Sequence, residues 1–175
     1  HLQTACEAYR RQYDAGRYFL HEHPAHCDSW NEPCIRELAK LPGVYWVQGP
    51  MCRFGLKATD KQGCGFVRKE TGWLTNCPRV AEKLQGACSN FGGREWHRHV
   101  QLTDGRAAVA AAYTPKLVTT VLRALKQQLI DDGELDKYLC AFASPVPEET
   151  IQGGEDWFYW DDVNGGVLDP ELTRL

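Results

Sequence analysis

The ten residues GRYFLHEHPA at positions 16–25 decide the fold that this chain is expected to adopt. A short apolar run leads directly into a polar cluster of one glutamate and two histidines. Buried strands of α/β proteins carry site residues in this way, at the end where the strand leaves the sheet. We therefore expect a strand over residues 17–20 that delivers Glu22 and His23 to a ligand-binding crevice.

The segment after this strand changes from a helical to an extended pattern. Ser29 and Glu32 have the spacing of a capping box, and apolar residues then recur at helical spacing up to the stop signal Pro42-Gly43. An apolar run at 44–47 predicts a second strand. A strand, a helix and a strand in this order indicate an α/β domain with a right-handed crossover.

Further elements are expected along the rest of the chain. Periodicity predicts a hairpin of residues 51–56 with 64–69 and extended segments at 73–75 and 97–102. Periodicity and stop signals predict helices over 3–15, over 78–87 and from Pro115 to a stop at Asp132-Gly133. The expected fold class is α/β: a partial Rossmann-like, methyltransferase-like sheet of strands 18–20, 44–47 and 66–68, with the helix from Pro115 on one face. Residues 1–143 form this domain, and residues 144–175 form a linker and an irregular aromatic, acidic tail.

Composition narrows the class of protein. A chain of 175 residues with 43% hydrophobic content has enough apolar side chains for one core, and its net charge of -3 argues against a protein-wide polyanion-binding surface. No apolar run is long enough for a membrane span and no signal sequence is evident, so we expect an intracellular protein without a membrane partner. Its eight cysteines are then expected to be reduced thiols, with metal ligation or disulfides as alternatives.

Glu22 has two interpretations. A carboxylate held rigidly at a strand end can recognise an amino-pyrimidine edge or act as a general acid, with His23 beside it. Alternatively it is solvated or paired with Arg53 or Arg68, because an unpaired carboxylate next to an apolar strand is costly. Since His21 and His23 lie on the strand face opposite Glu22, at most one imidazole is expected to share its site.

Cys88, His97 and His99 are the best candidates for a metal site, with Cys77 as a candidate fourth ligand. Thiolate and imidazole suit zinc, and a His-x-His strand presents two imidazoles on one face. The alternative is an ordinary thiol beside a surface β-ribbon. A second set has a spacing that matches no closed zinc finger: His21, His23, His26 and Cys27.

Basic and aromatic side chains predict a local nucleic-acid surface. Charge and stacking are combined within residues 94–99, which include Arg94, Trp96 and Arg98. Residues 71–76 surround Trp73 with hydrogen-bonding side chains, as in a cleft where Trp73 stacks on a base and Asn76 reads a polar edge. Alternatively this segment is a strand whose Asn76 caps the following helix. No phosphate-binding loop, G-x-S-x-G elbow or dinucleotide fingerprint occurs, which excludes those enzyme classes.

Several strings of the chain together resemble one family. They are GRYFLHEHPAHCDSW, CRFGL, KETGWLTNCPRVAEKL, HRHVQL and AAYTPKLVTTVLRAL, followed by WDDVNGGVLDPELTRL near the end. The series resembles a segment of copia-type retrotransposon polyproteins, notably those of dinoflagellate algae, and the last string resembles the run that leads into their reverse transcriptase domain. The resemblance implies an interior piece of a Pol polyprotein, with DNA or RNA and other segments of the same polyprotein as partners.

The string LHEHP is also distantly similar to a motif of DNA cytosine-5 methyltransferases, and this similarity implies that Glu22 holds a target cytosine. The chain departs from that family because no Phe-x-Gly-x-Gly cofactor loop and no Pro-Cys-Gln nucleophile loop lie upstream of Glu22, and His23 replaces an asparagine. We therefore expect a non-catalytic or degenerate methyltransferase-like module that does not bind S-adenosylmethionine by itself. The alternative is a catalytic fragment that needs upstream motifs.

Overall fold

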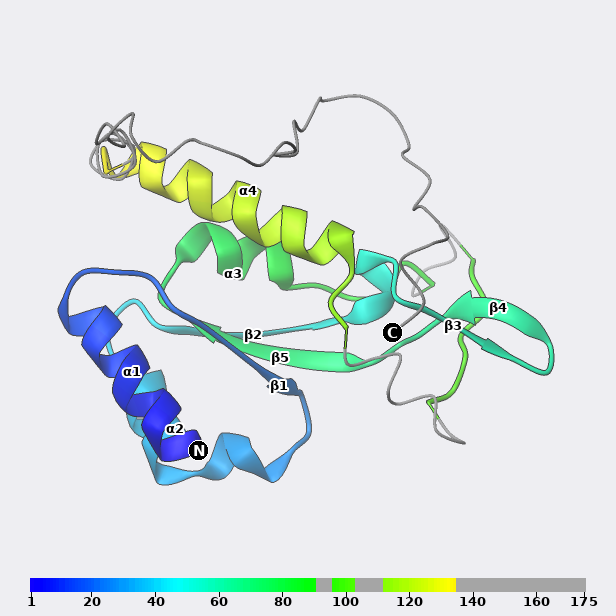
Figure 1. Cartoon of the computed structure of the whole chain (residues 1–175), viewed down its shortest axis with the longest axis horizontal. Coiled ribbons are helices and arrows are strands. Elements are labelled where there is room, and N and C mark those ends of the chain that lie inside the picture. Colours follow the sequence, from blue (N-terminus) through cyan, green and yellow to red (C-terminus); the bar gives the residue numbers. More distant parts are fainter. Residues whose placement is uncertain (91–95, 103–111, 135–175) are drawn as a thin grey trace, which may run out of the picture.

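The structure is a computed structural model that describes residues 1–90, 96–102 and 112–134 (Figure 1). The helices of this part are α1 (Leu2–Asp14), α2 (Pro33–Ala39), α3 (Pro78–Leu84) and α4 (Pro115–Asp131). Its strands are β1 (Leu20–Pro24), β2 (Tyr45–Pro50), β3 (Lys57–Asp60), β4 (Gly63–Phe66) and β5 (Glu70–Thr75), and two 3₁₀ helices are η1 (Asp28–Asn31) and η2 (Met51–Phe54). The expected linker and tail, residues 144–175, lie outside the described residues.

The central strand of the main sheet is β5. It pairs antiparallel with β1 on one side and with β2 on the other, so that Trp73 lies opposite both Glu22 and Val47. Consequently β1 and β2 are parallel to each other but separated by β5, and α2 lies in the connection between them. The mixed α/β class is confirmed. A Rossmann-like parallel sheet is not confirmed, because both pairings in the described sheet are antiparallel.

Two strands differ from their predicted positions. The first begins at Leu20, where the predicted strand was to end, so the polar residues HEHP lie within β1 rather than after it. The third strand of the sheet is β5, whereas of the predicted residues 66–68 the first ends β4 and the other two connect the β3–β4 hairpin to β5. Val67 is buried because it packs in the core from this connection. The apolar residue Val67 was therefore correctly predicted to be buried, but its burial does not make it part of the sheet.

Helices cover both faces of the sheet (Figure 1). On one face α1 and α2 pack around Cys6, Ile35 and Leu74, and on the other α3 and α4 pack around Trp73 and Leu84. The helix from Pro115 covers one face, as predicted. Residues 71–75 of β5 are all buried, as expected for a central strand covered on both sides. Among the described helices, none combines the length and hydrophobicity that a bilayer span requires.

The ends of α4 agree with their local sequence signals. Thr114 caps the helix, because its Oγ1 accepts a hydrogen bond from the Leu117 N–H at 3.2 Å, and Pro115 occupies the first turn. Gly133 follows the helix with a φ of 69°, a left-handed conformation that favours glycine. These signals lie within a few residues of each helix end, so the sequence alone was sufficient to predict them.

Candidate functional site

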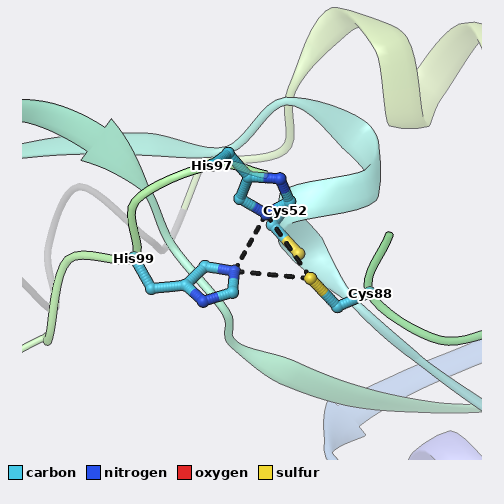
Figure 2. Close-up of side chains that lie close together, drawn as sticks. All are labelled: Cys52, Cys88, His97 and His99. Atoms are coloured by element: carbon cyan, nitrogen blue, oxygen red, sulfur yellow. Dashed lines mark hydrogen bonds between the residues drawn. The ribbon is translucent and has the colours of Figure 1, made fainter. Parts of the chain in front are cut away.

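Two cysteines and two histidines converge on one point beside the β3–β4 hairpin (Figure 2). One ligand atom from each lies within 4.8 Å of the other three, in the set Cys52, Cys88, His97 and His99. The Cys88 Sγ lies 3.5 Å from the Nε2 atoms of His97 and His99, which are 2.9 Å apart. Tetrahedral zinc, at about 2.3 Å from sulfur and about 2.0 Å from nitrogen, separates its ligand atoms by roughly 3.3 to 3.8 Å. The two Cys88 Sγ–Nε2 distances therefore match zinc geometry, whereas the two imidazole nitrogens would have to move apart to bind the same ion.

Three separate segments position these ligands. Cys52 lies in η2, whose start is fixed by a hydrogen bond from the Met51 N–H to the Lys69 carbonyl at 2.9 Å. Cys88 follows α3, where the Gly86 N–H donates to the Gln48 carbonyl at 3.0 Å. One segment is thus held by a backbone bond to the residue before β5 and the other by a backbone bond to the edge strand β2, so both cysteines occupy defined positions.

The histidines lie on an extended segment that runs beside β4. The Phe66 N–H donates to the Arg98 carbonyl at 2.9 Å, and the Val100 N–H donates to the Phe66 carbonyl at 2.7 Å. The side-chain amide of Asn90 binds both the N–H and the carbonyl of His97, at 2.8 and 2.7 Å. These two hydrogen bonds hold the backbone of His97 in place. The segment is extended, as the sequence predicted.

Arg98 lies between the two histidines and points to the other face of the segment. Its Nη1 donates to both carboxylate oxygens of Asp60 at 3.0 and 2.7 Å, and Nη2 donates to the Gly63 carbonyl. This alternation leaves His97 and His99 together on the cluster side. The half-buried ion pair attaches the hairpin to the histidine segment.

Burial shifts the pKa of one thiol and one imidazole of the cluster. Cys52 and Cys88 are 5% and 6% exposed. Burial and the adjacent Cys88 thiol raise the pKa of Cys52 to about 12, and burial, followed by the positive charges of His97 and Arg68, lowers the pKa of His99. Without a metal, Cys52 and His99 therefore favour their uncharged forms. A divalent cation reverses this preference for the thiols, because a coordinated thiol is deprotonated.

The structure brings together the three predicted ligands Cys88, His97 and His99. It does not add Cys77, which packs in the core at the start of α3 and is 1% exposed. The remaining member of the cluster is Cys52, which the sequence analysis missed. Its only signal was a cysteine in the string CRFGL, 36 residues before Cys88, and this separation matches no local spacing rule for metal ligands.

The second histidine-rich set does not form a comparable cluster. His23 Nδ1 lies 2.6 Å from Ser29 Oγ and 3.4 Å from Cys27 Sγ, while the rings of His21 and His23 stack at 4.8 Å. In the described part of the chain, no second group of three metal-ligating atoms converges. The seven described cysteines form no disulfide, and Cys140 lies outside the described residues.

Glu22 lines a groove of about 660 Å³ beside β1. Its carboxylate lies 3.4 Å from the Lys69 Nζ and accepts a hydrogen bond from the Tyr113 hydroxyl at 3.0 Å, so its partners differ from Arg53 and Arg68, which the alternative interpretation named. His21 and His23 both line this groove as well. The expectation that at most one imidazole shares the site with Glu22 is wrong, because the groove runs past the sheet edge and reaches both faces of β1.

The predicted nucleic-acid residues lie in different environments. Trp73 is 1% exposed in the core, whereas Trp96 is 82% exposed. The Asn76 side chain accepts from the Phe19 N–H and donates to the Arg17 carbonyl, both at 2.9 Å, so it binds the segment before β1 rather than facing a cleft. Arg98 is engaged with Asp60, and Arg94 lies outside the described residues. Trp96 alone of the described members has a freely accessible side chain.

His21 gives the fold a specific pH dependence. Its side chain is 5% exposed and its Nε2 has no hydrogen-bond partner among the described residues. Burial, followed by the positive charge of His23, lowers the pKa of His21. The unfolded state therefore binds a proton more readily than the folded state. Buried, neutral His21 makes its full contribution to the free energy of unfolding above the unfolded pKa of about 6.5. This contribution decreases as the pH falls below that value.

We expect the His21→Leu variant to lose less stability than the unmodified chain between pH 7 and pH 5. The slope of the free energy of unfolding against pH is expected to differ between the two proteins by at most about 1.4 kcal/mol per pH unit, because one proton is involved. Urea unfolding followed by circular dichroism at several pH values measures it, and substitution of the exposed His26 by leucine controls for the loss of an imidazole. Parallel pH profiles for the unmodified chain and the His21 variant would contradict this prediction.

Comparison with known proteins identifies no relative. No protein-family model, no curated protein and no solved structure matches the chain. The function is therefore argued from the geometry of the described residues.

Proposed function

We propose that this chain is a non-catalytic, zinc-binding module of a retroelement polyprotein. The observation that carries zinc binding is the convergence of four ligand atoms within 4.8 Å from Cys52, Cys88, His97 and His99. The retroelement part of the proposal is supported by the sequence resemblance alone. Two thiolates and two imidazoles suit zinc, whereas magnesium and calcium prefer oxygen ligands. Four protein ligands complete a tetrahedral shell and leave no position for a substrate, which is characteristic of a structural rather than a catalytic zinc site.

The metal would connect parts of the chain that are distant in sequence. It would join η2, the segment after α3 and the histidine segment, adding a covalent link to the hydrogen bonds, ion pair and core contacts that already hold them. A cross-link that closes long loops restricts the unfolded chain more than the folded one. In this proposal the relationship to methyltransferases is a degenerate one, and the Glu22 carboxylate contacts Lys69 and Tyr113 in the groove beside β1.

Metal analysis of the full chain tests this function. Protein purified without chelator is expected to contain about one equivalent of zinc, and X-ray absorption is expected to give two sulfur ligands at about 2.3 Å and two nitrogen ligands at about 2.0 Å. A cobalt-substituted sample provides an independent optical signal for tetrahedral thiolate coordination. Protein that lacks zinc and binds neither added zinc nor cobalt would overturn the proposal.

A second candidate function, single-stranded nucleic-acid binding, is favoured by the surface around the metal ligands. Trp96 directly precedes His97 and is 82% exposed. Arg68 is close enough to His99 to lower the pKa of that imidazole; its Nε pairs with Glu70 at 2.9 Å, but its side chain is still 53% exposed. Lys57 Nζ lies 5.0 Å from the centre of the Phe66 ring, which itself contacts His97. Accessible stacking and positive charge are thus combined, as in proteins that bind single strands without sequence preference.

We expect the Trp96→Ala variant to bind an oligothymidylate roughly tenfold more weakly, since one stacked base contributes about 1 to 3 kcal/mol. Arg68→Ala should also weaken binding and should reduce its dependence on salt concentration. Fluorescence anisotropy at several salt concentrations measures both effects. The matched control is Tyr45→Ala, which removes an exposed aromatic side chain from β2. If the unmodified chain shows no binding at low salt, this second function is excluded.

A further inference from the structure

The groove beside β1 has apolar walls on both sides of a sheet edge. One wall comes from α1 and the other from α4, and residues 20–23 of β1 lie between them. The walls include Leu2, Ala5, Tyr9, Leu117, Val118 and Leu122. Val118 and Leu122 are 42% and 58% exposed, so much of the α4 wall faces no other described residue. We refer to this feature as the β1 groove.

The floor of the β1 groove is a strand edge whose outward backbone groups have no backbone partner among the described residues. The Ala25 N–H donates to the Glu70 carbonyl, which fixes the alternation of the β1–β5 ladder. His21 and His23 therefore direct their backbone groups toward β5, whereas Leu20 and Glu22 direct theirs away from it. The edge ends at Pro24, which has no N–H and whose carbonyl accepts from the Trp30 indole at 2.8 Å. The two N–H and two carbonyl groups of Leu20 and Glu22 can thus pair with one short extended segment.

The two walls determine what such a segment must contain. Side chains of an added strand alternate between the α1 wall and the α4 wall, and both walls are apolar. A strand that is buried on both faces needs a continuous apolar run rather than an alternating one. The side chains must also be large, because they have about 660 Å³ to fill. A run of about four aromatic residues meets these requirements.

We propose that residues 157–160, with the sequence Trp-Phe-Tyr-Trp, bind the β1 groove as an added strand. These residues lie outside the described part of the chain. Only 22 residues separate them from Glu134, and a connection of that length spans up to about 75 Å, compared with about 25 Å for the whole of α4. Acidic residues flank the run on both sides and limit it to four positions. This length matches the short exposed edge of β1. Covalent attachment gives the run an effective concentration in the millimolar range.

Amide hydrogen exchange of the full chain tests this proposal. In the unmodified protein the Leu20 and Glu22 amides are expected to be protected. Substituting serine at all four positions, 157–160, is expected to accelerate their exchange by about tenfold or more, because a paired amide exchanges only through opening. The His21 amide points toward β5 and should keep its exchange rate, which separates loss of the added strand from unfolding of the sheet.

A pair of variants on α4 tests the groove itself. Val118→Lys is expected to accelerate exchange at Leu20 and Glu22, whereas Ile130→Lys should not, because Ile130 is equally exposed but lies outside the groove. Three outcomes overturn the proposal: rapid exchange at both amides in the unmodified chain, protection that persists in the serine variant, and protection that disappears on dilution. The second outcome indicates another segment in the groove, and the third indicates a second copy of the chain.

Discussion

The Cys88→Ser variant is expected to retain less than a tenth of an equivalent of zinc and to unfold about 8 to 16 °C below the unmodified chain. Cys88 Sγ contacts both imidazoles of the cluster, so its loss removes the ligand that the other groups surround. A metal present at about a thousand times its dissociation constant contributes about 4 kcal/mol to stability. In a chain of this size, 1 kcal/mol corresponds to a shift of roughly 2 to 4 °C in the melting temperature.

The control is Cys64→Ser, which removes an exposed cysteine from the β3–β4 hairpin outside the cluster. This variant should keep both its zinc and its melting temperature. Chelation of the unmodified chain should reproduce the Cys88→Ser melting temperature, and chelator should have little further effect on the variant. If Cys88→Ser keeps a full equivalent of zinc, or melts with the control, then Cys88 is not a ligand of a stabilising metal.

Local signals explain which parts of the fold and site were predictable. Thr114, Pro115 and Gly133 define α4 within a few residues of its ends. The histidines at 97 and 99 share one strand face because of alternation, which depends on no distant residue. In these cases the physical cause and the sequence signal lie in the same short segment, so the sequence was sufficient.

Contacts between distant segments explain the remainder. The polar residues of β1 belong to a strand because it lies at a sheet edge, where His21 is covered by Trp30 and Glu22 is met by Lys69 and Tyr113. Cys52 joins the metal cluster because η2 and the end of α3 meet at the sheet. Neither relationship leaves a periodic pattern, and both depend on β5 pairing between β1 and β2.

Trp73 and Trp96 show the same limitation, since nothing in their immediate sequence separates a core tryptophan from a surface one. Trp73 lies on the central strand between Glu22 and Val47, and its ring packs edge-on against Phe54 at 6.1 Å. Trp96 is outside this core and is 82% exposed. Their substitutions should therefore have opposite consequences for stability and binding.

We expect Trp73→Ala to reduce the free energy of unfolding by about 3 to 5 kcal/mol, the range observed when a buried aromatic side chain is truncated in a core. This is a large fraction of the roughly 5 to 15 kcal/mol that stabilises a typical domain. Trp96→Ala should change stability by less than about 0.5 kcal/mol, as is usual for an exposed position without specific contacts. Urea unfolding followed by circular dichroism measures both, and Trp73→Phe, which keeps an aromatic ring in the core, should be milder than Trp73→Ala. A Trp73→Ala variant that is as stable as the unmodified chain but fails to bind an oligothymidylate would instead place Trp73 on the nucleic-acid surface and contradict its position in the core.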